Sequence, residues 1–358
     1  MDQRSAAPAG PPSSRRHARR EGSSTRRALA VVGVLVLLLA AGGFGAAWWF
    51  QNQLDSNIER LGDPFADVQD RPDPAPEKAG AKNKPVNILV LGSDSRISAG
   101  DPSQWEAGAQ RTDAIMLAHL PADRKTAEVV SIPRDAWVPI PGHGEAKINA
   151  AFSYGGPSLM IQTVEDLTDV HIDHFVVTDF ESFTSMTDAL DGVRIRVPED
   201  IGDGDEVFFS AGVHMMSGEE ALTYARQRHG LSNGDFGRVQ RQQNWMRAIL
   251  AKVNNNRNDV GMMSNFFTTV SESVAADENF TIDRMRNLYM SARGLATNDV
   301  DFMTAPYSGT GRSDDGQSIV VLDRERFDPL MKAISKDDAA DYVKKNAEEL
   351  ELLPATVK

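Results

Sequence analysis

The chain has 358 residues, of which 41% are hydrophobic and 25% charged, a composition that is ordinary for a globular protein. Its net charge of −13 and its lack of cysteine exclude a uniformly basic nucleic-acid-binding surface and a disulfide framework. The charge is uneven. Residues 1–27 contain seven arginines and two acidic residues, a balance of +5, so the rest of the chain carries −13 − 5 = −18.

The N-terminal region predicts a basic tail followed by a membrane anchor. Residues 1–27 are rich in Pro, Ser, Ala and Arg, which is typical of a disordered segment. Residues 28–50 contain no charged side chain, and 23 such residues can cross the ~30 Å hydrocarbon layer as a helix. Because the arginines precede this span, we expect a single-pass type II protein of the plasma membrane, with everything after residue 50 outside. A cleaved signal peptide is the alternative, but Trp48 and Trp49 end the run where an interfacial aromatic belt would lie.

The remaining elements alternate along the chain. Residues 51–85 are rich in proline and charge, which predicts a stalk. Apolar runs predict strands at 86–91, 113–120, 127–133, 174–180, 192–198, 300–306 and 318–323. Helices are predicted near 157–167, 180–190, 218–224, 236–253, 282–295 and 324–335. This alternation favours an α/β domain over 86–335, with helices covering a mixed sheet, and a charged tail at 336–358.

Residues 224–243, YARQRHGLSNGDFGRVQRQQ, concentrate four arginines in an acidic chain. A capping-box pattern, SGEE, starts a helix at Ser217. We expect this helix to end near Tyr224, because Arg226 and Arg228 point about 200° apart on a helix but the same way in an extended segment. After turn-forming residues, Asp235 is the predicted N-cap of the next helix.

On that second helix, Arg238, Arg241, Gln242 and Trp245 share one face, because their spacing is i, i+3, i+4 and i+7. A cation in the first helical turn is electrostatically unfavourable, so Arg238 predicts an anion between the arginines and the helix N-terminus. The planar guanidinium matches phosphate oxygens two at a time. The alternative is a solvated helix face with surface ion pairs. Arg247 lies outside this face, so its replacement by lysine is expected to be neutral.

Acid–arginine pairs also flank the first three predicted strands: Asp94 with Arg96, Arg111 with Asp113, and Arg134 with Asp135. In open α/β sheets, ligands gather near strand ends. Mg²⁺ binds through few carboxylates and leaves positions for phosphate oxygens, so the pattern favours a diphosphate–metal site. Taken singly, an aspartate in such a position is more often a turn or cap residue than a metal ligand. The HIDH sequence at 171–174 is interpreted as structural.

Together these segments resemble the LytR-CpsA-Psr (LCP) family of bacterial envelope phosphotransferases. The resemblance covers residues 84–335 in family order, through NILVLGSDSR, RTDAIMLAHL, VVSIPRD, KINAAFSYGGP, DGVRIRV, SGEEALTYARQRH and GDFGRVQRQQ. It implies a three-layer α/β/α domain after a single transmembrane helix, with an apolar tunnel between sheet and helices that holds a polyprenyl diphosphate. We interpret the apolar faces of 158–167 and 180–190 as candidate tunnel walls, with ordinary core packing as the alternative.

The resemblance also implies an activity and a set of site residues. Family members transfer a glycopolymer phosphate from the lipid carrier to peptidoglycan, and the polymer, whether teichoic acid, capsule or arabinogalactan, stays open. By motif position, Asp94 and Asp113 would hold Mg²⁺, and Asp135 is a candidate base. Arg111, Asp113 and Arg134 would be catalytic, because cations stabilise charge on the transferring phosphoryl group. The residues implied to contact the diphosphate are Arg111, Arg134, Arg226, Arg228, Arg238 and Gln242.

Three other functions are alternatives to this transfer activity. A lipid-diphosphate hydrolase would use the same site with water as the nucleophile. A polyprenyl phosphate-binding protein would bind lipid without turnover. A transcriptional regulator is disfavoured, because the domain is acidic, is expected outside the cell and shows no helix-turn-helix pattern, so no nucleic-acid partner is expected.

Overall fold

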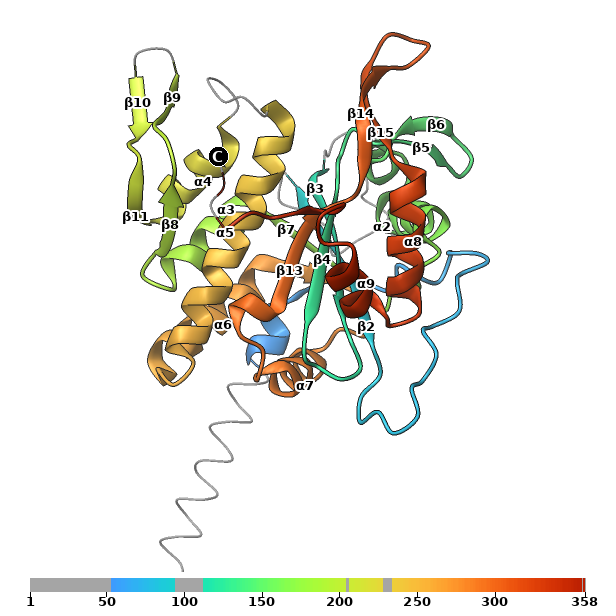
Figure 1. Cartoon of the computed structure of the whole chain (residues 1–358). Coiled ribbons are helices and arrows are strands. Elements are labelled where there is room, and N and C mark those ends of the chain that lie inside the picture. Colours follow the sequence, from blue (N-terminus) through green and yellow to red (C-terminus); the bar gives the residue numbers. More distant parts are fainter. Residues whose placement is uncertain (1–52, 94–111, 204–205, 228–233, 356, 358) are drawn as a thin grey trace, which may run out of the picture. The chain divides into compact units, whose positions relative to one another are not determined.

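A computed structural model describes residues 53–93, 112–203, 206–227, 234–355 and 357. In this part of the chain, one eight-stranded mixed sheet has helices on both faces, so the domain has three layers (Figure 1). The sheet order is β1-β12-β7-β2-β3-β4-β13-β16. The strands are β1 (Glu59–Arg60), β2 (Val86–Ser93), β3 (Thr112–Leu120), β4 (Ala127–Ile132), β7 (His174–Asp179), β12 (Val274–Ala276), β13 (Val300–Thr304) and β16 (Glu351–Leu352).

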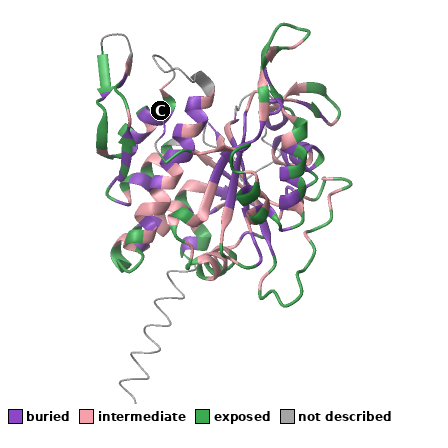
Figure 2. Ribbon diagram, in the orientation of Figure 1, coloured by how far each residue is buried: buried purple, intermediate pink, exposed green. Residues whose placement is uncertain are grey.

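Alternating side chains divide the sheet between two cores. Leu89 and Leu91 face the larger core, which is covered by α2 (Asn149–Thr168), α8 (Arg324–Ser335) and α9 (Ala339–Lys345). Val90 and Met116 face the opposite way, toward the side of the sheet where α3 (Phe180–Asp188) and α5 (Gly234–Asn256) lie. Because strand residues alternate between faces, each central strand reads as a nearly continuous apolar run. These strands are mostly buried, whereas the outer hairpins are largely exposed (Figure 2).

Smaller elements surround these layers. The hairpin of β8 (Val193–Val197) and β11 (Gly212–Met216) packs with α4 (Gly218–Arg226) against α5. The helices α6 (Val260–Ser273) and α7 (Ile282–Ala292) and the 3₁₀ helix η2 (Thr297–Asp299) precede β13. Three further hairpins are β5 (Trp137–Ile140) with β6 (Gly144–Lys147), β9 (Ile201–Asp203) with β10 (Glu206–Phe209), and β14 (Tyr307–Arg312) with β15 (Ser318–Leu322).

The predicted strands and helices of 86–335 are present, and the mixed sheet covered by helices is confirmed. The helix predicted near 157–167 begins earlier, at Asn149, and bends at Gly155 and Gly156, where Gly156 has a φ of 63°. Pro157 therefore starts a new helical segment, where its missing N–H costs no hydrogen bond. Of the strands in the hairpins, the sequence prediction located only β8 and β15. It missed α6, the partner strands β11 and β14, and the hairpins β5–β6 and β9–β10, because their apolar patterns are short or interrupted.

Two helix boundaries near the arginines differ from the prediction. The capping box of Ser217 and Glu220 is confirmed, but α4 runs through Arg226 instead of ending near Tyr224. It continues because Tyr224 and Ala225 are both buried against α5. The second helix begins at Gly234, so Asp235 lies in its first turn and is not the N-cap.

The segments on either side of the predicted domain are part of its fold. In 51–85, expected to be a stalk, Leu54, Ile58 and Leu61 are buried and β1 joins the edge of the main sheet. In 336–358, expected to be a tail, α9 packs into the larger core and β16 pairs with β13. Residues 28–50 lie outside the described residues. Within 53–357, apart from the gaps given above, no helix is both long and apolar enough to cross a membrane.

A polar row crosses the sheet on the face of the larger core. Asn87, His119, Glu128 and Asp301 are consecutive register partners on β2, β3, β4 and β13. The Nδ1 atom of His119 lies 2.7 Å from Oδ1 of Asn87. Glu128 is fully buried, and its burial raises the pKa of its carboxyl from 4.5 to about 7, with a contribution from the charges of Asp301, Asp337 and Asp123. Folding therefore favours the protonated form of this carboxyl.

The raised pKa of Glu128 makes the free energy of unfolding depend on pH in a defined direction. Between pH 4.5 and about 7 the folded state keeps a proton on Glu128 that the unfolded state loses. The free energy of unfolding therefore falls as the pH rises through this window, by an amount on the order of 3 kcal/mol from this group. We expect Glu128→Gln to lose less stability than the wild type between pH 5 and pH 8, measured by urea denaturation. The exposed Glu199→Gln is the matched control and should follow the wild type. Parallel curves for the Glu128 variant and the wild type would contradict the assignment.

Candidate active site

The candidate site residues gather at one edge of the central sheet. The carboxyl ends of β2, β4, β7 and β13 lie at this edge with the start of β3, because β3 runs antiparallel to β2 and β4. Ser93 and Thr112, which flank residues 94–111, are register partners. Three predicted site residues lie outside the described residues: Asp94, Arg111 and Arg228.

The first polar group at this edge is a chain of four alternating charges. The guanidinium of Arg134, in the turn after β4, forms an ion pair with the carboxylate of Asp113 at the start of β3. Nε of Arg134 also lies 3.6 Å from Oδ2 of Asp135, whose Oδ1 is 3.0 Å from Nζ of Lys147 on β6. The side chains of Arg134 and Asp113 are 21% and 18% exposed, so the pair is held in place but still reaches solvent. Asp135, the candidate base, is thus held between two cations.

The second polar group consists of side chains on α5, where the helix is buried on all sides around residues 241–245. Residues 241–245 are all buried, although consecutive helical residues point about 100° apart. Gln243 donates to Oγ of Ser131 and to the carbonyl of Met303, both at 2.8 Å, and so bonds α5 to the sheet. Asn244 donates to the hydroxyl of Tyr224 on α4 at 2.9 Å.

The next residue of α5 contacts a third element. Trp245 donates to Oγ1 of Thr187 on α3 at 2.9 Å, and its ring packs edge-on against Phe183 with centroids 4.7 Å apart. Buried polar groups must be hydrogen-bonded, so these contacts fix both the position and the rotation of the helix. The face that carries the arginines is therefore set by tertiary contacts.

Two guanidinium groups are buried one helical turn apart on α5. Arg238 is 3% exposed and Arg241 is fully buried. Burial lowers the pKa of Arg241, and the positive charge of Arg238 lowers it further, while Tyr224 acts in the opposite direction. Arg241 donates to the backbone carbonyl of Gln227, directly after Arg226 at the end of α4. The sequence prediction left Arg241 out of the site, and the structure assigns it the role of joining α4 to α5.

This arrangement brings several predicted residues close together. Arg226 is the last residue of α4 and is exposed, in a helical turn where a cation is favoured. Arg238 and Gln242 lie on α5, four residues apart and so on the same side of the helix. Two cations held at short range in a buried region repel each other, and an anion bound between or beside them would relieve that repulsion. The arginine cluster, formed by Arg226, Arg238 and Arg241, is therefore suited to an anionic ligand.

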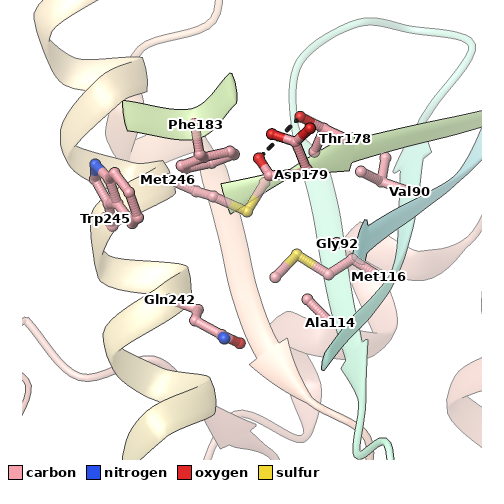
Figure 3. A pocket seen from close by; sticks show the side chains of 10 residues that line it. All are labelled: Val90, Gly92, Ala114, Met116, Thr178, Asp179, Phe183, Gln242, Trp245 and Met246. Atoms are coloured by element: carbon pink, nitrogen blue, oxygen red, sulfur yellow. Dashed lines mark hydrogen bonds between the residues drawn. The ribbon is translucent and has the colours of Figure 1, made fainter. Parts of the chain in front are cut away.

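An apolar cavity lies between the sheet and the helices α3 and α5 (Figure 3). Its empty volume is about 470 Å³, part of which is open to solvent. The sheet contributes Val90, Ala114 and Met116, while Phe183 of α3 and Trp245 of α5 close the other side (Figure 3). Gln242 of α5 also lines the cavity, and Arg238 lies four residues before it on the same side of the helix. Asp113 directly precedes the lining residue Ala114 along β3. The cavity fits an apolar chain attached to an anionic head group.

One tunnel wall predicted from the sequence is different in the structure. Met160 and Val164, in the segment 158–167 of α2, are fully buried in the core on the opposite face of the sheet. That segment therefore packs the core, which was the alternative interpretation. The segment 180–190 does line the cavity, through Phe183, and α5 supplies the wall expected from α2.

The structure adds one acidic residue that the sequence prediction missed. Asp179 ends β7, is the register partner of Ser93 and lines the cavity. One of its oxygens, Oδ1, accepts a hydrogen bond from the backbone N–H of Ser182 at 2.6 Å, which caps α3. The sequence did contain a signal for Asp179, because it is an aspartate directly between a strand and a helix at the end of the sheet where ligands bind.

The predicted metal ligands are only partly described. Asp113 belongs to the described residues and Asp94 does not; within the described ranges, no group of three or more His, Asp or Glu side chains is arranged to hold a metal ion. The HIDH histidines are structural, as predicted. His171 contacts the carbonyl of Pro72 at 2.9 Å, and His174 lies 3.2 Å from the carboxylate of Asp277 and stacks on Phe280.

Comparison with known proteins identifies the family. A model of the LytR_cpsA_psr family matches residues 60–336. The chain belongs to this family. The resemblance inferred from the strand-end and arginine motifs is therefore confirmed, and the buried arginines and the cavity lie within the matched region.

Curated relatives have two kinds of name. "Regulatory protein MsrR" of Staphylococcus aureus is 37% identical over 174 residues, which cover 48% of this chain and 50% of the relative. The chain thus spans about half the length of these relatives. A second relative, "Polyisoprenyl-teichoic acid--peptidoglycan teichoic acid transferase TagU" of Enterococcus faecalis, is 32% identical over 249 residues, 68% of this chain and 77% of the relative.

Solved structures share the fold. Bacillus subtilis TagV is 27% identical with a TM-score of 0.59, and the match covers 72% of this chain and 98% of TagV. A structure described as "TagT bound to LI-WTA" is 28% identical with a TM-score of 0.57, covering 73% of this chain and 93% of that one.

The arginine cluster predicts a measurable affinity for pyrophosphate. Inorganic pyrophosphate should raise the melting temperature of the wild type, because a ligand that binds the folded state stabilises it by mass action. Arg238→Lys should weaken this shift, since lysine cannot form the paired guanidinium bonds, which corresponds to a loss of about ten- to hundredfold in affinity. Arg196→Lys, on the exposed side of β8, is the control. Equal pyrophosphate-induced shifts in both variants would show that Arg238 does not contact the anion.

Arg247 cannot serve as that control, contrary to the sequence prediction. Its guanidinium donates to the carbonyl of Pro354 at 2.9 Å, to Oδ1 of Asn244 at 2.6 Å and to the carbonyl of Ala355 at 3.2 Å. These bonds attach the C-terminal segment to α5, so lysine at this position would disturb the fold.

Proposed function

We propose that this chain transfers a glycopolymer phosphate from a polyprenyl diphosphate carrier to a sugar hydroxyl of peptidoglycan, forming a phosphodiester. The observation that carries the proposal is the apolar cavity placed beside two buried arginines, because a polyprenyl diphosphate is an apolar chain joined to a concentrated anion. The names of the relatives support it, since the E. faecalis relative is called a teichoic acid transferase and TagT is described bound to LI-WTA.

The reaction requires no external energy source. The acceptor hydroxyl attacks the phosphorus atom attached to the polymer, the bond from that phosphorus to the bridging oxygen breaks, and polyprenyl phosphate leaves. The proton of the hydroxyl passes to a base or to solvent. Charge spreads over the phosphoryl oxygens in the transition state, so positioned cations are the main catalytic requirement. Arg134, Arg226 and Arg238 supply such cations in the described residues, with Arg111 and Arg228 added by sequence.

Mg²⁺ is proposed as the cofactor. Asp113 offers the carboxylate oxygen that this ion prefers, and Asp94 would supply a second one. Arg134 forms an ion pair with the Asp113 carboxylate at the start of β3, which fits a role shared between metal and guanidinium. Bound Mg²⁺ would neutralise charge on the diphosphate oxygens. Asp135 is bonded to Lys147 and Arg134, so its proposed contribution is to orient Arg134.

We also propose that the domain works outside the cell, anchored in the plasma membrane through residues 28–50. The uncharged run behind seven arginines supports this topology. A regulator that contacts nucleic acid remains disfavoured, because the chain after residue 27 carries −18 and Arg238 and Arg241 are buried inside the domain.

The activity predicts a clear loss in two variants. Asp113→Asn and Arg134→Lys should each reduce transfer of labelled glycopolymer from a lipid diphosphate to peptidoglycan, by about ten- to hundredfold for the arginine. The measurement is radiolabel in insoluble peptidoglycan, with thermal melts to exclude unfolding and Arg196→Lys as the control. Release of soluble polymer phosphate without attachment would identify a hydrolase instead. Binding of lipid with no turnover in the wild type would identify a carrier.

The topology predicts a protease result. Protease added to intact spheroplasts should degrade residues 51–358 and leave the 27-residue basic tail protected. An epitope tag at each end, read by immunoblot before and after lysis, distinguishes the two sides. A C-terminal tag that survives until lysis would place the domain in the cytoplasm and remove its access to peptidoglycan.

A further inference from the structure

The helix α7 is a surface helix with an unusual make-up. None of its eleven residues is buried. Its inner side, through Ile282, Met285 and Leu288, packs only partly against a small cluster formed by Ile58, Ala276 and Phe280. Its outer side carries Met290, a large apolar side chain that is 49% exposed. The helix therefore covers one small cluster with its inner side and presents apolar surface to its surroundings on its outer side.

The charge of this region is opposite to that of the domain. Residues 280–295, FTIDRMRNLYMSARGL, contain Arg284, Arg286 and Arg293 against the single acid Asp283, whereas the chain after residue 27 carries −18. Asp283 forms an ion pair with Arg286 at 3.0 Å, and all three arginines are exposed. A basic surface with exposed apolar side chains matches a bilayer of anionic lipids, where each arginine near the surface adds attraction.

The adjoining turn between α5 and α6 extends this surface. Arg257 donates to the backbone carbonyl of Arg293 at 3.3 Å, which joins the turn to the end of α7. Val260, at the start of α6, is 80% exposed. The acid in this turn, Asp259, caps α6 by accepting from the N–H of Met262 at 3.0 Å. The turn thus adds one more arginine and one more exposed apolar side chain beside α7.

The length of the chain limits how far α7 can be from an anchor. Oδ1 of Asp55 accepts a hydrogen bond from the backbone N–H of Ile282 at 3.2 Å, at the start of α7. Asp55 follows Phe50, the last residue of the uncharged run, by five positions along the chain. A fully extended chain spans about 3.5 Å per residue, so this link reaches at most about 18 Å whatever its course. Residues 53–61 belong to the fold, so the proline-rich region that follows adds no length to the tether.

We propose that α7 lies on the outer surface of the lipid bilayer as an interfacial helix, with its arginines against anionic head groups and Met290 toward the acyl chains. The inference rests on the proposed anchor at 28–50. It states that the domain is held directly against the membrane and in one orientation. The competing surface is an exposed apolar patch on β10 and β11, which contains Val207, Phe208, Val213 and Met215.

The absence of native cysteine allows a site-specific test on the full chain. Met290→Cys carries an environment-sensitive fluorophore, and the protein is reconstituted into phosphatidylcholine vesicles that contain phosphatidylglycerol and a nitroxide lipid quencher. Val321→Cys on β15 is the matched control, because it is 43% exposed and lies at the opposite end of the domain from α7 (Figure 1). Met215→Cys reports on the competing patch, with 60% exposure.

We expect the label at 290 to be quenched several-fold more strongly than the labels at 321 and 215. The difference should shrink in 1 M salt, where the Debye length is only about 3 Å, and when Arg284→Gln and Arg293→Gln are combined. Equal quenching at 290 and 321 in vesicles that retain the protein would overturn the inference while leaving the anchor intact. Stronger quenching at 215 would overturn it in favour of the other orientation.

Two more outcomes separate the causes of failure. If the label at 290 is shielded from an aqueous quencher even in detergent without a bilayer, the surface binds protein and the inference is wrong. If the chain does not float with the vesicles at all, both the proposed anchor at 28–50 and the proposed contact of α7 with the bilayer are wrong. Activity plays no part in these measurements, so the transferase proposal stands or falls separately.

Discussion

The structure of the site depends on the burial of one stretch of α5, residues 241–245. Five consecutive residues of this helix are buried, so neighbours surround it on every side. Gln243 bonds it to β4 and β13, Asn244 to α4, and Trp245 to α3. Each of these polar groups would cost free energy if its partner were removed, because none can turn to water instead. The helix is thereby fixed in rotation as well as in position.

The fixed position of α5 keeps two positive charges inside the domain, where a charge is otherwise unfavourable. With α5 fixed, Arg238 and Arg241 stay inside the domain and close to each other. The same rotation puts Gln242 and Trp245 along an apolar cavity whose other wall is the sheet. A ligand with an anionic head and an apolar tail satisfies both environments at once. The geometry is therefore suited to the proposed lipid phosphate, whose head and tail would contact two physically different surfaces positioned by the same helix.

The fold of the N-terminal segment 53–61 bears on how the domain would reach the proposed lipid substrate in the membrane. A proline-rich region would be expected to act as a spacer, but Leu54, Ile58 and Leu61 pack into the fold and β1 extends the sheet. The chain before Asp55 is then too short to let the domain move far from an anchor. A lipid carrier confined to the bilayer and a domain confined to its surface would meet in two dimensions, which raises their effective concentration.

Much of this protein was determined by local sequence patterns. Short, nearly continuous apolar runs located the central strands, the SGEE sequence located the start of α4, and the strand-end motifs identified the family, since all these signals act over a few residues. What the sequence could not supply were the contacts between distant segments. Gln243 and Ser131 are 112 residues apart, and nothing in either neighbourhood indicates that they bond.

The same limit explains the errors at the site. Arg241 and Arg238 look alike in sequence, and only their tertiary neighbours separate a structural arginine from one beside the cavity. Asp179 became a candidate only when β7 was found beside β2. The 158–167 helix has an apolar face, as a tunnel wall needs, but which side of the sheet it covers is decided by chain crossover. Local propensity and periodicity were thus readable from the sequence, whereas the partner of each buried polar group depended on the assembled sheet.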